Sequence, residues 1–357
     1  MSEKVLVAMS GGVDSSVAAQ LLVEAGYTVA GATMCLGVEE DGDRTRCCGR
    51  DAVDDARRVC DRLKIPHYVM DYAGEMQEKV IDKFAAEYLR GRTPNPCVDC
   101  NRYLKFGSLL AKAKAIGFDG LATGHYARIE YDGGEWQLLK SRNADKDQTY
   151  FLYPIAAADL PSILFPLGDR TKDEVRGLAR KIGLPIAEKA ESQDICFVTS
   201  GDYRQFILAW EGSNGPGVTG DLVDKSGRVL GRHRGMLYYT IGQRSGLGIS
   251  APTPLYVIGI DAARNRIIIG EKGDLMARGL WAADLNFLTE PLPDEMEAKI
   301  RYRKKPARCR IEKIGERLRI LFAERQESIT PGQAVVLYEG NRVLGGGVIE
   351  EVIHDID

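Results

Sequence analysis

The chain has 357 residues, of which 44% are hydrophobic and 28% charged, and its net charge is −3. This composition is typical of a globular protein of two or three domains, and the slightly negative charge argues against a protein that coats nucleic acid indiscriminately. No apolar run reaches transmembrane length, and the N-terminus lacks the basic and apolar segments of a secretory signal. We therefore expect a cytoplasmic, monomeric protein without a membrane partner.

Patterns of alternating strand and helix fill the first half of the chain. Short apolar runs predict strands at 4–9, 27–34, 66–72 and 119–126. Helical spacing of apolar residues predicts helices at 16–26, 52–65 and 104–117. This order predicts βαβ units and a mostly parallel sheet covered on both faces, with ligands bound beyond the carboxyl ends of its strands.

The pattern changes near residue 200. A glycine-rich stretch at 211–235 is followed by short strand patterns at turn spacings typical of small barrels. We predict three domains: an α/β domain with a Rossmann-like parallel sheet at 1–202, a β-rich domain at 203–274 and a β-barrel at 275–357.

The motif "SGGVDSS" at 10–16 lies between the first predicted strand and the first predicted helix. Glycines at such a turn let backbone N–H groups approach a ligand, and a helix N-terminus favours an anion, so phosphate is the expected guest. Asp14 would either cap the helix or help arrange a magnesium ion. The Lys-Ser/Thr ending of a Walker A loop is absent. A tight connection without a ligand is the alternative.

Two further stretches carry cysteines. In "GRTPNPCVDCN" at 91–101, Cys97 and Cys100 follow a proline-restricted turn and precede a predicted helix, whose N-terminus would lower their thiol pKa. The CxxC spacing also suits half of a metal site or a redox pair. Cys196, in "SQDICFV" at 192–198, is by itself more typical of a buried strand cysteine.

A strongly basic stretch runs from Lys299 to Arg319 inside an otherwise acidic chain. Charge runs of this kind are usually a solvated face of the domain. Tyr302 within it and the predicted barrel favour an RNA-facing surface instead.

"SGGVDSS" resembles the PP-loop of the N-type ATP pyrophosphatases. The strings "GRTPNPCVDCN", "LATGHYAR", "KDQTYFLY", "SQDICFV", "IGQRSGLGI" and "PGQAVVLYEGNRVLGGGVI" follow it in one order. Together they resemble the tRNA-specific 2-thiouridylases over nearly the whole chain. The resemblance implies that ATP, with Mg²⁺, adenylates the 2-oxygen of a flipped wobble uridine in tRNAs of the Lys, Glu and Gln type. Sulfur then replaces that oxygen, and 2-thiouridine, AMP and pyrophosphate are formed.

The resemblance also implies a role for individual residues. Cys196 would receive a persulfide sulfur from a cysteine desulfurase or sulfur-relay protein, and Cys100 would attack it; with Asp14 they are the expected catalytic residues. The expected ATP contacts are Ala8, Met9, Ser10, Gly11, Gly12, Val13, Asp14, Ser15, Met34 and Gly124. The expected tRNA contacts are His125, Lys146, Asp147, Gln148, Arg301, Tyr302 and Gln333.

The cysteines leave a second mechanism open. Cys97 stands where some family members carry an aspartate. Cys97, Cys100 and Cys196 could therefore ligate a [4Fe–4S] cluster that delivers hydrosulfide. The motifs are also compatible with a PP-loop ligase that adenylates a small molecule, or with a tRNA-binding protein without catalysis.

Overall fold

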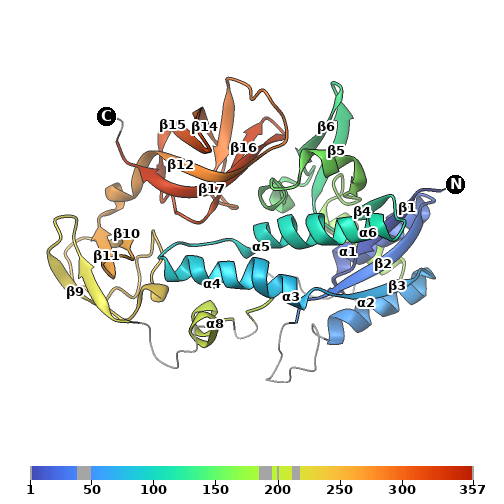
Figure 1. Ribbon diagram of the computed structural model, residues 1–357, viewed down its shortest axis with the longest axis horizontal. Helices are drawn as coiled ribbons and strands as arrows, with labels where there is room; N and C mark the ends of the chain where they lie inside the picture. The colour runs from blue at the N-terminus through green and yellow to red at the C-terminus, as the bar shows by residue number, and fades with distance from the viewer. Residues whose placement is uncertain (1, 38–49, 185–194, 199–200, 211–217, 356–357) are drawn as a thin grey trace.

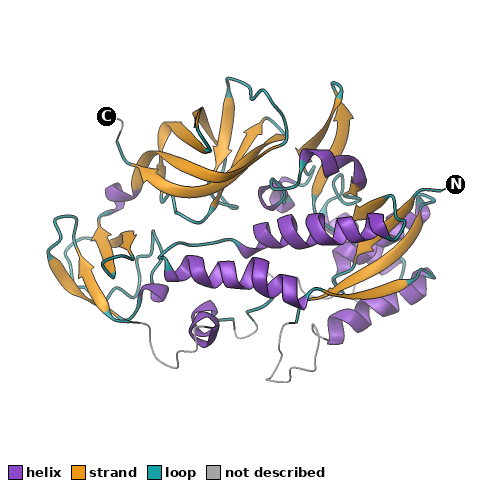
Figure 2. Ribbon diagram, viewed as in Figure 1, coloured by secondary structure: helices purple, strands orange, loops and turns teal. Residues whose placement is uncertain are grey.

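The computed structural model describes residues 2–37, 50–184, 195–198, 201–210 and 218–355. Figure 1 shows a parallel sheet and a smaller sheet at opposite ends of the longest axis, with long helices between them. Figure 2 shows the concentration of helices in the N-terminal part and of strands in the C-terminal part. The predicted change of pattern near residue 200 is therefore visible in the fold. No described helix is long and apolar enough to cross a membrane.

The first sheet has the order β3-β2-β1-β4-β7, with every pairing parallel. Its strands are β1 (Lys4–Ala8), β2 (Thr28–Cys35), β3 (His67–Asp71), β4 (Gly120–Ala122) and β7 (Ile163–Leu164). Side chains of β1 alternate between two cores, with Leu6 in one and Val5 and Val7 in the other. This alternation reflects the period of two along a strand and gives the sheet two covered faces, as predicted.

Helices cover both faces of this sheet. The helices are α1 (Val13–Glu24), α2 (Arg50–Leu63), α3 (Ala73–Met76), η1 (Gln77–Ile81), α4 (Asp82–Leu89), α5 (Pro96–Asp99), η2 (Cys100–Leu109), α6 (Leu110–Ala115), α7 (Lys172–Lys181) and α8 (Tyr203–Trp210). Short 3₁₀ turns follow at η3 (Ala144–Lys146), η4 (Thr149–Phe151) and η5 (Ala157–Ser162). Apolar residues of α1, α2 and α7 share one core, whereas those of α4, η2 and α6 share the other.

The helix predicted at 104–117 begins earlier than expected. Helical turns continue without a break from Pro96 through α5, η2 and α6 to Ala115. Pro96 occupies the first helical position, where its missing N–H costs nothing, and Asn95 caps the helix by accepting the N–H of Cys97 at 3.2 Å. Cys97 and Cys100 therefore lie in the first turns of the helix and not before it.

The second half of the chain forms two β units. The first has the order β10-β11-β8-β9 and consists of β8 (Gly220–Val223), β9 (Val229–His233), β10 (Tyr256–Asp261) and β11 (Arg266–Gly270), with turns η6 (Met236–Tyr238) and η7 (Lys272–Leu275). The second closes into a barrel because β12 pairs with both β15 and β17. Its strands are β12 (Met276–Phe287), β13 (Met296–Lys299), β14 (Ala307–Ile314), β15 (Arg317–Glu327), β16 (Ala334–Glu339) and β17 (Arg342–Ile353).

A hairpin from the N-terminal half joins the barrel sheet. Its strands, β5 (Ala127–Asp132) and β6 (Glu135–Lys140), pair with each other, and Leu139 of β6 pairs with Arg342 of β17. The guanidinium of Arg342 also lies 2.6 Å from the carboxylate of Glu135. The barrel is thus attached directly to the domain that carries the glycine loop.

Candidate active site

The glycine loop closes on itself at the carboxyl end of β1. The backbone N–H of Ser10 donates to Oγ of Ser15 at 3.2 Å, and Oγ of Ser16 donates to the carbonyl of Gly12 at 2.9 Å. Gly11 has φ = +70°, and a Cβ there would lie 2.4 Å from the carbonyl oxygen of Ala52. Only glycine fits this position. The loop is therefore a tight turn directly in front of α1, and its use as an anion site stays a prediction.

Two of the expected ATP contacts come from elsewhere in the chain, and one of them, Gly124, touches the loop. Gly124 follows β4, and a Cβ there would lie 2.6 Å from the backbone nitrogen of Ser15. Met34 lies near the end of β2, paired with Met70 of β3. Ala8 to Ser15 continue from β1 into α1. The structure brings the loop, Gly124 and the end of β2 to one edge of the sheet; ATP binding by these residues stays a prediction.

Asp14 does not cap α1. The N-cap position is occupied by Gly12 without a side-chain hydrogen bond. The Asp14 carboxylate instead accepts from Nζ of Lys172 at 2.8 and 2.9 Å and from the Tyr126 hydroxyl at 2.9 Å. Lys172 could not be predicted from the sequence, because it lies 158 residues from Asp14 and has no motif around it.

The three cysteines of the two cysteine motifs lie near one another. Cys97 and Cys196 are exposed and Cys100 is buried. The charges of Cys97 and Cys100 both act on the Cys196 thiol, so the structure brings together residues that are almost 100 positions apart. Residues 192–194 of the "SQDICFV" motif lie outside the described residues.

The expectation of a lowered thiol pKa is wrong for Cys97, and the pKa of the Cys196 thiol, for which the sequence predicted no lowering, is raised as well. Although both residues are exposed overall, the surrounding protein desolvates their thiolates. This burial raises the pKa of Cys97 above its usual value and that of Cys196 to about 12. Desolvation outweighs both the helix N-terminus and the nearby charge of Lys105, which acts in the lowering direction on each thiol. Both thiols therefore rest in the protonated form.

Lys105 connects the cysteine helix to the strand that carries Gly124. Its Nζ donates to Oδ1 of Asn101 at 3.0 Å and lies 3.5 Å from Nε2 of His125. The other ring nitrogen of His125 is 2.6 Å from Oγ1 of Thr123. Burial first, and then the charge of Lys105, hold the pKa of His125 well below its usual value. A neutral imidazole thus lies beside Lys105, directly after the glycine that touches the loop.

The iron–sulfur alternative stays a prediction. Among the described residues, no group of three or more His, Cys, Asp or Glu side chains is arranged to hold a single metal ion. A cluster places its cysteine ligands farther apart than a single ion does, so this finding does not decide whether Cys97, Cys100 and Cys196 could hold one. We derive no step through a cluster.

Most of the residues expected to contact tRNA interact with other residues of the protein itself. Asp147 is buried and accepts from Ser141 and Thr149, Gln148 accepts the N–H of Tyr126, and Arg301 donates to the carbonyl of Ser328 and to Thr330. Tyr302 packs against Phe151 with ring centroids 4.6 Å apart, and Lys146 is half-buried at the end of η3. Their contact with tRNA remains a prediction.

Gln333 holds the barrel against the cysteine motif. Its Nε2 donates to the carbonyl of Thr93 at 2.8 Å, and the N–H of Thr93 donates to the carbonyl of Pro331 at 2.9 Å. The loop 331–333 of the barrel therefore braces the proline-rich turn from which the cysteine helix starts.

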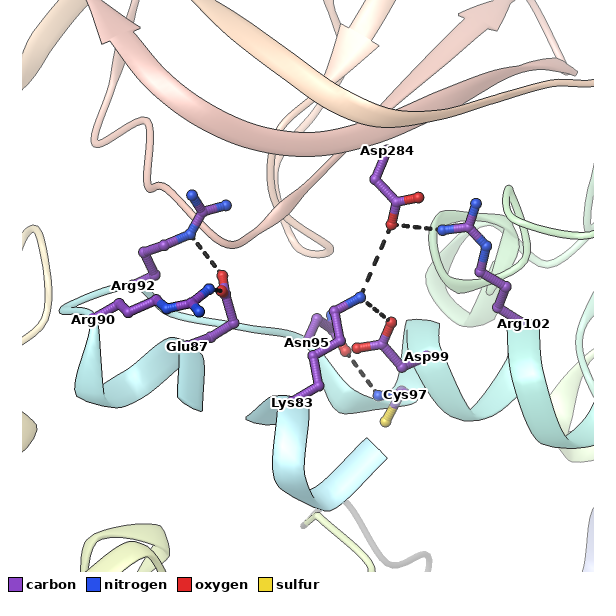
Figure 3. A network of polar contacts seen from close by, with 9 residues as sticks. All are labelled: Lys83, Glu87, Arg90, Arg92, Asn95, Cys97, Asp99, Arg102 and Asp284. Atoms are coloured by element: carbon purple, nitrogen blue, oxygen red, sulfur yellow. Dashed lines mark hydrogen bonds and ion pairs between the residues drawn. The ribbon is translucent and has the colours of Figure 1, made fainter. Parts of the chain in front are cut away.

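A polar network adds a second link between the barrel and the cysteine helix (Figure 3). Lys83 of α4 binds Asp99 at 2.7 Å, and Arg102 of η2 binds Asp284 of β12 at 2.6 Å. Lys83 also lies 3.9 Å from Asp284. Asp99 is thus directed toward Lys83. Nothing in the local sequence of Asp284 marks it as part of this network.

Known families match nearly the whole chain. The family model described as the tRNA methyl transferase HUP domain matches residues 3–200, and that of the tRNA methyl transferase PRC-barrel domain matches 213–271. The aminomethyltransferase beta-barrel domain model matches 277–349. These matches confirm the predicted fold class: a parallel-sheet domain followed by two mainly β domains, of which the last is a barrel.

Relatives share this architecture over their full length. The chain is 60% identical over 354 residues to the tRNA-specific 2-thiouridylase MnmA 1 of Syntrophus aciditrophicus, covering 99% of this chain and 94% of that protein. It is 51% identical over 359 residues to the tRNA-specific 2-thiouridylase MnmA of Carboxydothermus hydrogenoformans, covering 98% of each. A solved U34-tRNA thiolase NcsA from Methanococcus maripaludis with its [4Fe-4S] cluster aligns at 19% identity with a TM-score of 0.35, over 58% of this chain and 66% of that one. That likeness is too slight to support an argument.

Proposed function

Because this chain belongs to the tRNA-specific 2-thiouridylase family, we propose that it replaces the 2-oxygen of the wobble uridine in tRNA with sulfur and consumes ATP. One observation supports this most strongly. Gly124 lies against the glycine loop, and the next residue, His125, lies beside Lys105, whose charge acts on the Cys97 and Cys196 thiols. A uridine held at this point would face both the nucleotide and the thiols.

The first step is adenylation of the base. The loop 9–16 would bind the phosphates of ATP through its backbone N–H groups and the N-terminus of α1. Magnesium, which Asp14 would help to hold, neutralises phosphate charge. The uridine 2-oxygen attacks the α-phosphate, pyrophosphate leaves, and the oxygen becomes part of an adenylate that can depart from C2 as AMP. The base must leave the stacked anticodon loop for this attack.

The second step is sulfur delivery. The Cys196 thiolate takes the outer sulfur of a donor persulfide, and the donor thiolate leaves. The Cys100 thiolate then attacks the inner sulfur of Cys196–S–SH, so a Cys100–Cys196 disulfide forms and hydrosulfide is released. Hydrosulfide adds to C2 of the adenylated uridine and expels AMP. An external thiol must then reduce the disulfide. The proximity of the three thiols supports this order.

The test uses the full chain with an unmodified tRNA transcript, Mg·ATP, a persulfide-loaded cysteine desulfurase and a reducing thiol. AMP is quantified by chromatography and 2-thiouridine by mass spectrometry of the digested tRNA. For Cys196→Ala and Cys100→Ser we expect tRNA-dependent AMP release within about threefold of the wild type, but loss of 2-thiouridine. Cys309→Ala, which removes a buried barrel thiol, is the matched control and should retain both.

Three results would contradict the proposal. Full 2-thiouridine formation by Cys196→Ala would remove that residue from the reaction. AMP release that does not depend on tRNA would favour a small-molecule ligase. If 2-thiouridine forms only when iron is bound and the iron-free protein is inactive, the iron–sulfur mechanism would be favoured over the persulfide relay.

A further inference from the structure

Lys172 occupies an unusual place for a lysine. It is the first residue of α7, is only 8% exposed, and reaches the glycine loop from a different part of the sheet. Lysines are seldom buried unless they are paired, and here Nζ contacts both carboxylate oxygens of Asp14, at 2.8 and 2.9 Å. The pairing explains how the lysine can be buried, but it leaves open why a lysine lies at this loop.

The surroundings of Lys172 favour a role toward an anion. Asp14 lies in the first turn of α1, and only Val13 separates it from the two glycines, so the Lys172 ammonium lies next to the loop that we propose binds phosphate. Asp14 does not depend on Lys172 alone, because the Tyr126 hydroxyl also donates to it at 2.9 Å. The first turn of α7 is already closed by a capping box between Thr171 and Glu174. Because these two residues already cap the N-terminus of α7, the positive charge that this helix places at the site is that of the Lys172 side chain.

Charge balance gives the reason for a resident cation. A triphosphate carries up to about four negative charges, and Asp14 would add a fifth at the same loop, where reduced solvent screening makes repulsion costly. A lysine that is already positioned by Asp14 can stay near the loop while nucleotide binds. Its flexible four-carbon stem allows the ammonium to change partners without movement of the backbone.

We propose that Lys172 is a phosphate-binding residue of this site that changes partner when nucleotide binds. Without nucleotide it is held by Asp14; with Mg·ATP bound, Asp14 turns toward the metal and the ammonium of Lys172 pairs with the triphosphate. The proposal rests on the proposed use of ATP by the glycine loop. It does not require thiolation of tRNA.

The experiment compares ligands with and without phosphates. Calorimetric titration of the full chain with Mg·ATP and, separately, with adenosine gives the two dissociation constants. For Lys172→Met we expect the dissociation constant of Mg·ATP to rise at least 10-fold, and that of adenosine to change less than twofold. Lys172→Arg, which keeps the charge, should recover most of the ATP affinity. Lys181→Met, at the exposed end of the same helix, is the matched control and should bind both ligands as the wild type does.

A second comparison separates phosphate binding from a structural ion pair, and also serves if Lys172→Met does not fold. Lys172→Met alone removes the lysine partner of the Asp14 carboxylate. Asp14→Asn and the double variant Asp14→Asn/Lys172→Met both lack this carboxylate, so comparing them avoids that effect. We expect the double variant to bind Mg·ATP at least 10-fold more weakly than Asp14→Asn alone. Equal ATP affinity in these two proteins, or equal losses for ATP and adenosine in Lys172→Met, would overturn the proposal. ATP binding that follows this pattern without tRNA thiolation would instead refute the proposed function alone.

Discussion

The glycine loop and the cysteine helix are linked through Gly124, His125 and Lys105, but their geometry has different origins. The loop is fixed by its own backbone, with Gly11 at φ = +70° and serine hydroxyls that bind within the loop. The cysteine site is assembled from the helix that starts at Pro96, the segment around Cys196 and the braces that the barrel supplies through Gln333 and Asp284. A substitution that adds a side chain against the loop should therefore disturb its backbone, whereas the cysteine site depends on contacts between distant segments.

The largest expected effect concerns the resting reactivity of Cys196. Because burial raises its pKa from 9.0 to about 12, its thiolate fraction at pH 8 should be ~100- to 1,000-fold below that of an ordinary cysteine. The thiolate is the form that reacts, so the rate of alkylation should increase about tenfold per pH unit from pH 7 to 10 without levelling off. Iodoacetamide labelling followed by mass spectrometry of the Cys196 peptide measures this rate.

The same peptide in the chain unfolded with guanidinium chloride is the control and should level off near pH 9. A plateau below pH 9 in the folded protein would show that the assembled site activates the thiol at rest. Repeating the measurement with tRNA and ATP would show whether the substrates lower the pKa of the Cys196 thiol.

The next effect concerns the loop. In Gly124→Ala the new methyl group would lie 2.6 Å from the backbone nitrogen of Ser15, so either the loop or the strand end must shift. Such overpacking costs about 1–3 kcal/mol, and we expect ATP affinity to fall about 10- to 100-fold. Titration with Mg·ATP measures it.

Gly177→Ala is the matched control, because a Cβ at Gly177, inside α7, meets nothing within 4 Å. It should bind ATP normally and be slightly more stable, since alanine favours a helix over glycine by up to about 1 kcal/mol. Normal ATP affinity in Gly124→Ala would mean that the loop is less rigid than its backbone contacts indicate.

The smallest effect concerns the network between barrel and cysteine helix. Asp284 has φ = +50°, which asparagine tolerates, so Asp284→Asn removes the charge and keeps the shape. The pairs with Arg102 and Lys83 are partly exposed, and solvent screening limits the expected loss to about 0.5–1 kcal/mol of unfolding free energy. Urea denaturation measures it, with the exposed Asp294→Asn as the control. An unchanged midpoint would show that Gln333 alone suffices to brace the helix.

The parts of the molecule that follow from local sequence could be predicted. The parallel sheet follows from apolar periodicity, and the loop follows from the glycines and serines of one short motif. Interactions between distant segments could not be predicted. Lys172 lies in no motif, and only the fold brings it to Asp14. The raised pKa of Cys97 is caused by burial, which a helix N-terminus recognised from sequence does not indicate. The proximity of Cys196 to Cys100 came from the family resemblance and not from spacing.

The attachment of the β5–β6 hairpin to the barrel limits how this protein can be divided. The carbonyl of Asn341, in the turn between β16 and β17, accepts from the backbone of Lys140, whose ammonium reaches the carbonyl of Gly340 at 2.7 Å. A fragment that begins at residue 275 would lose these partners together with Glu135, and the start of β17 would become an unpaired strand edge open to association with other chains. Independent expression of the barrel should therefore include a substitute for the hairpin.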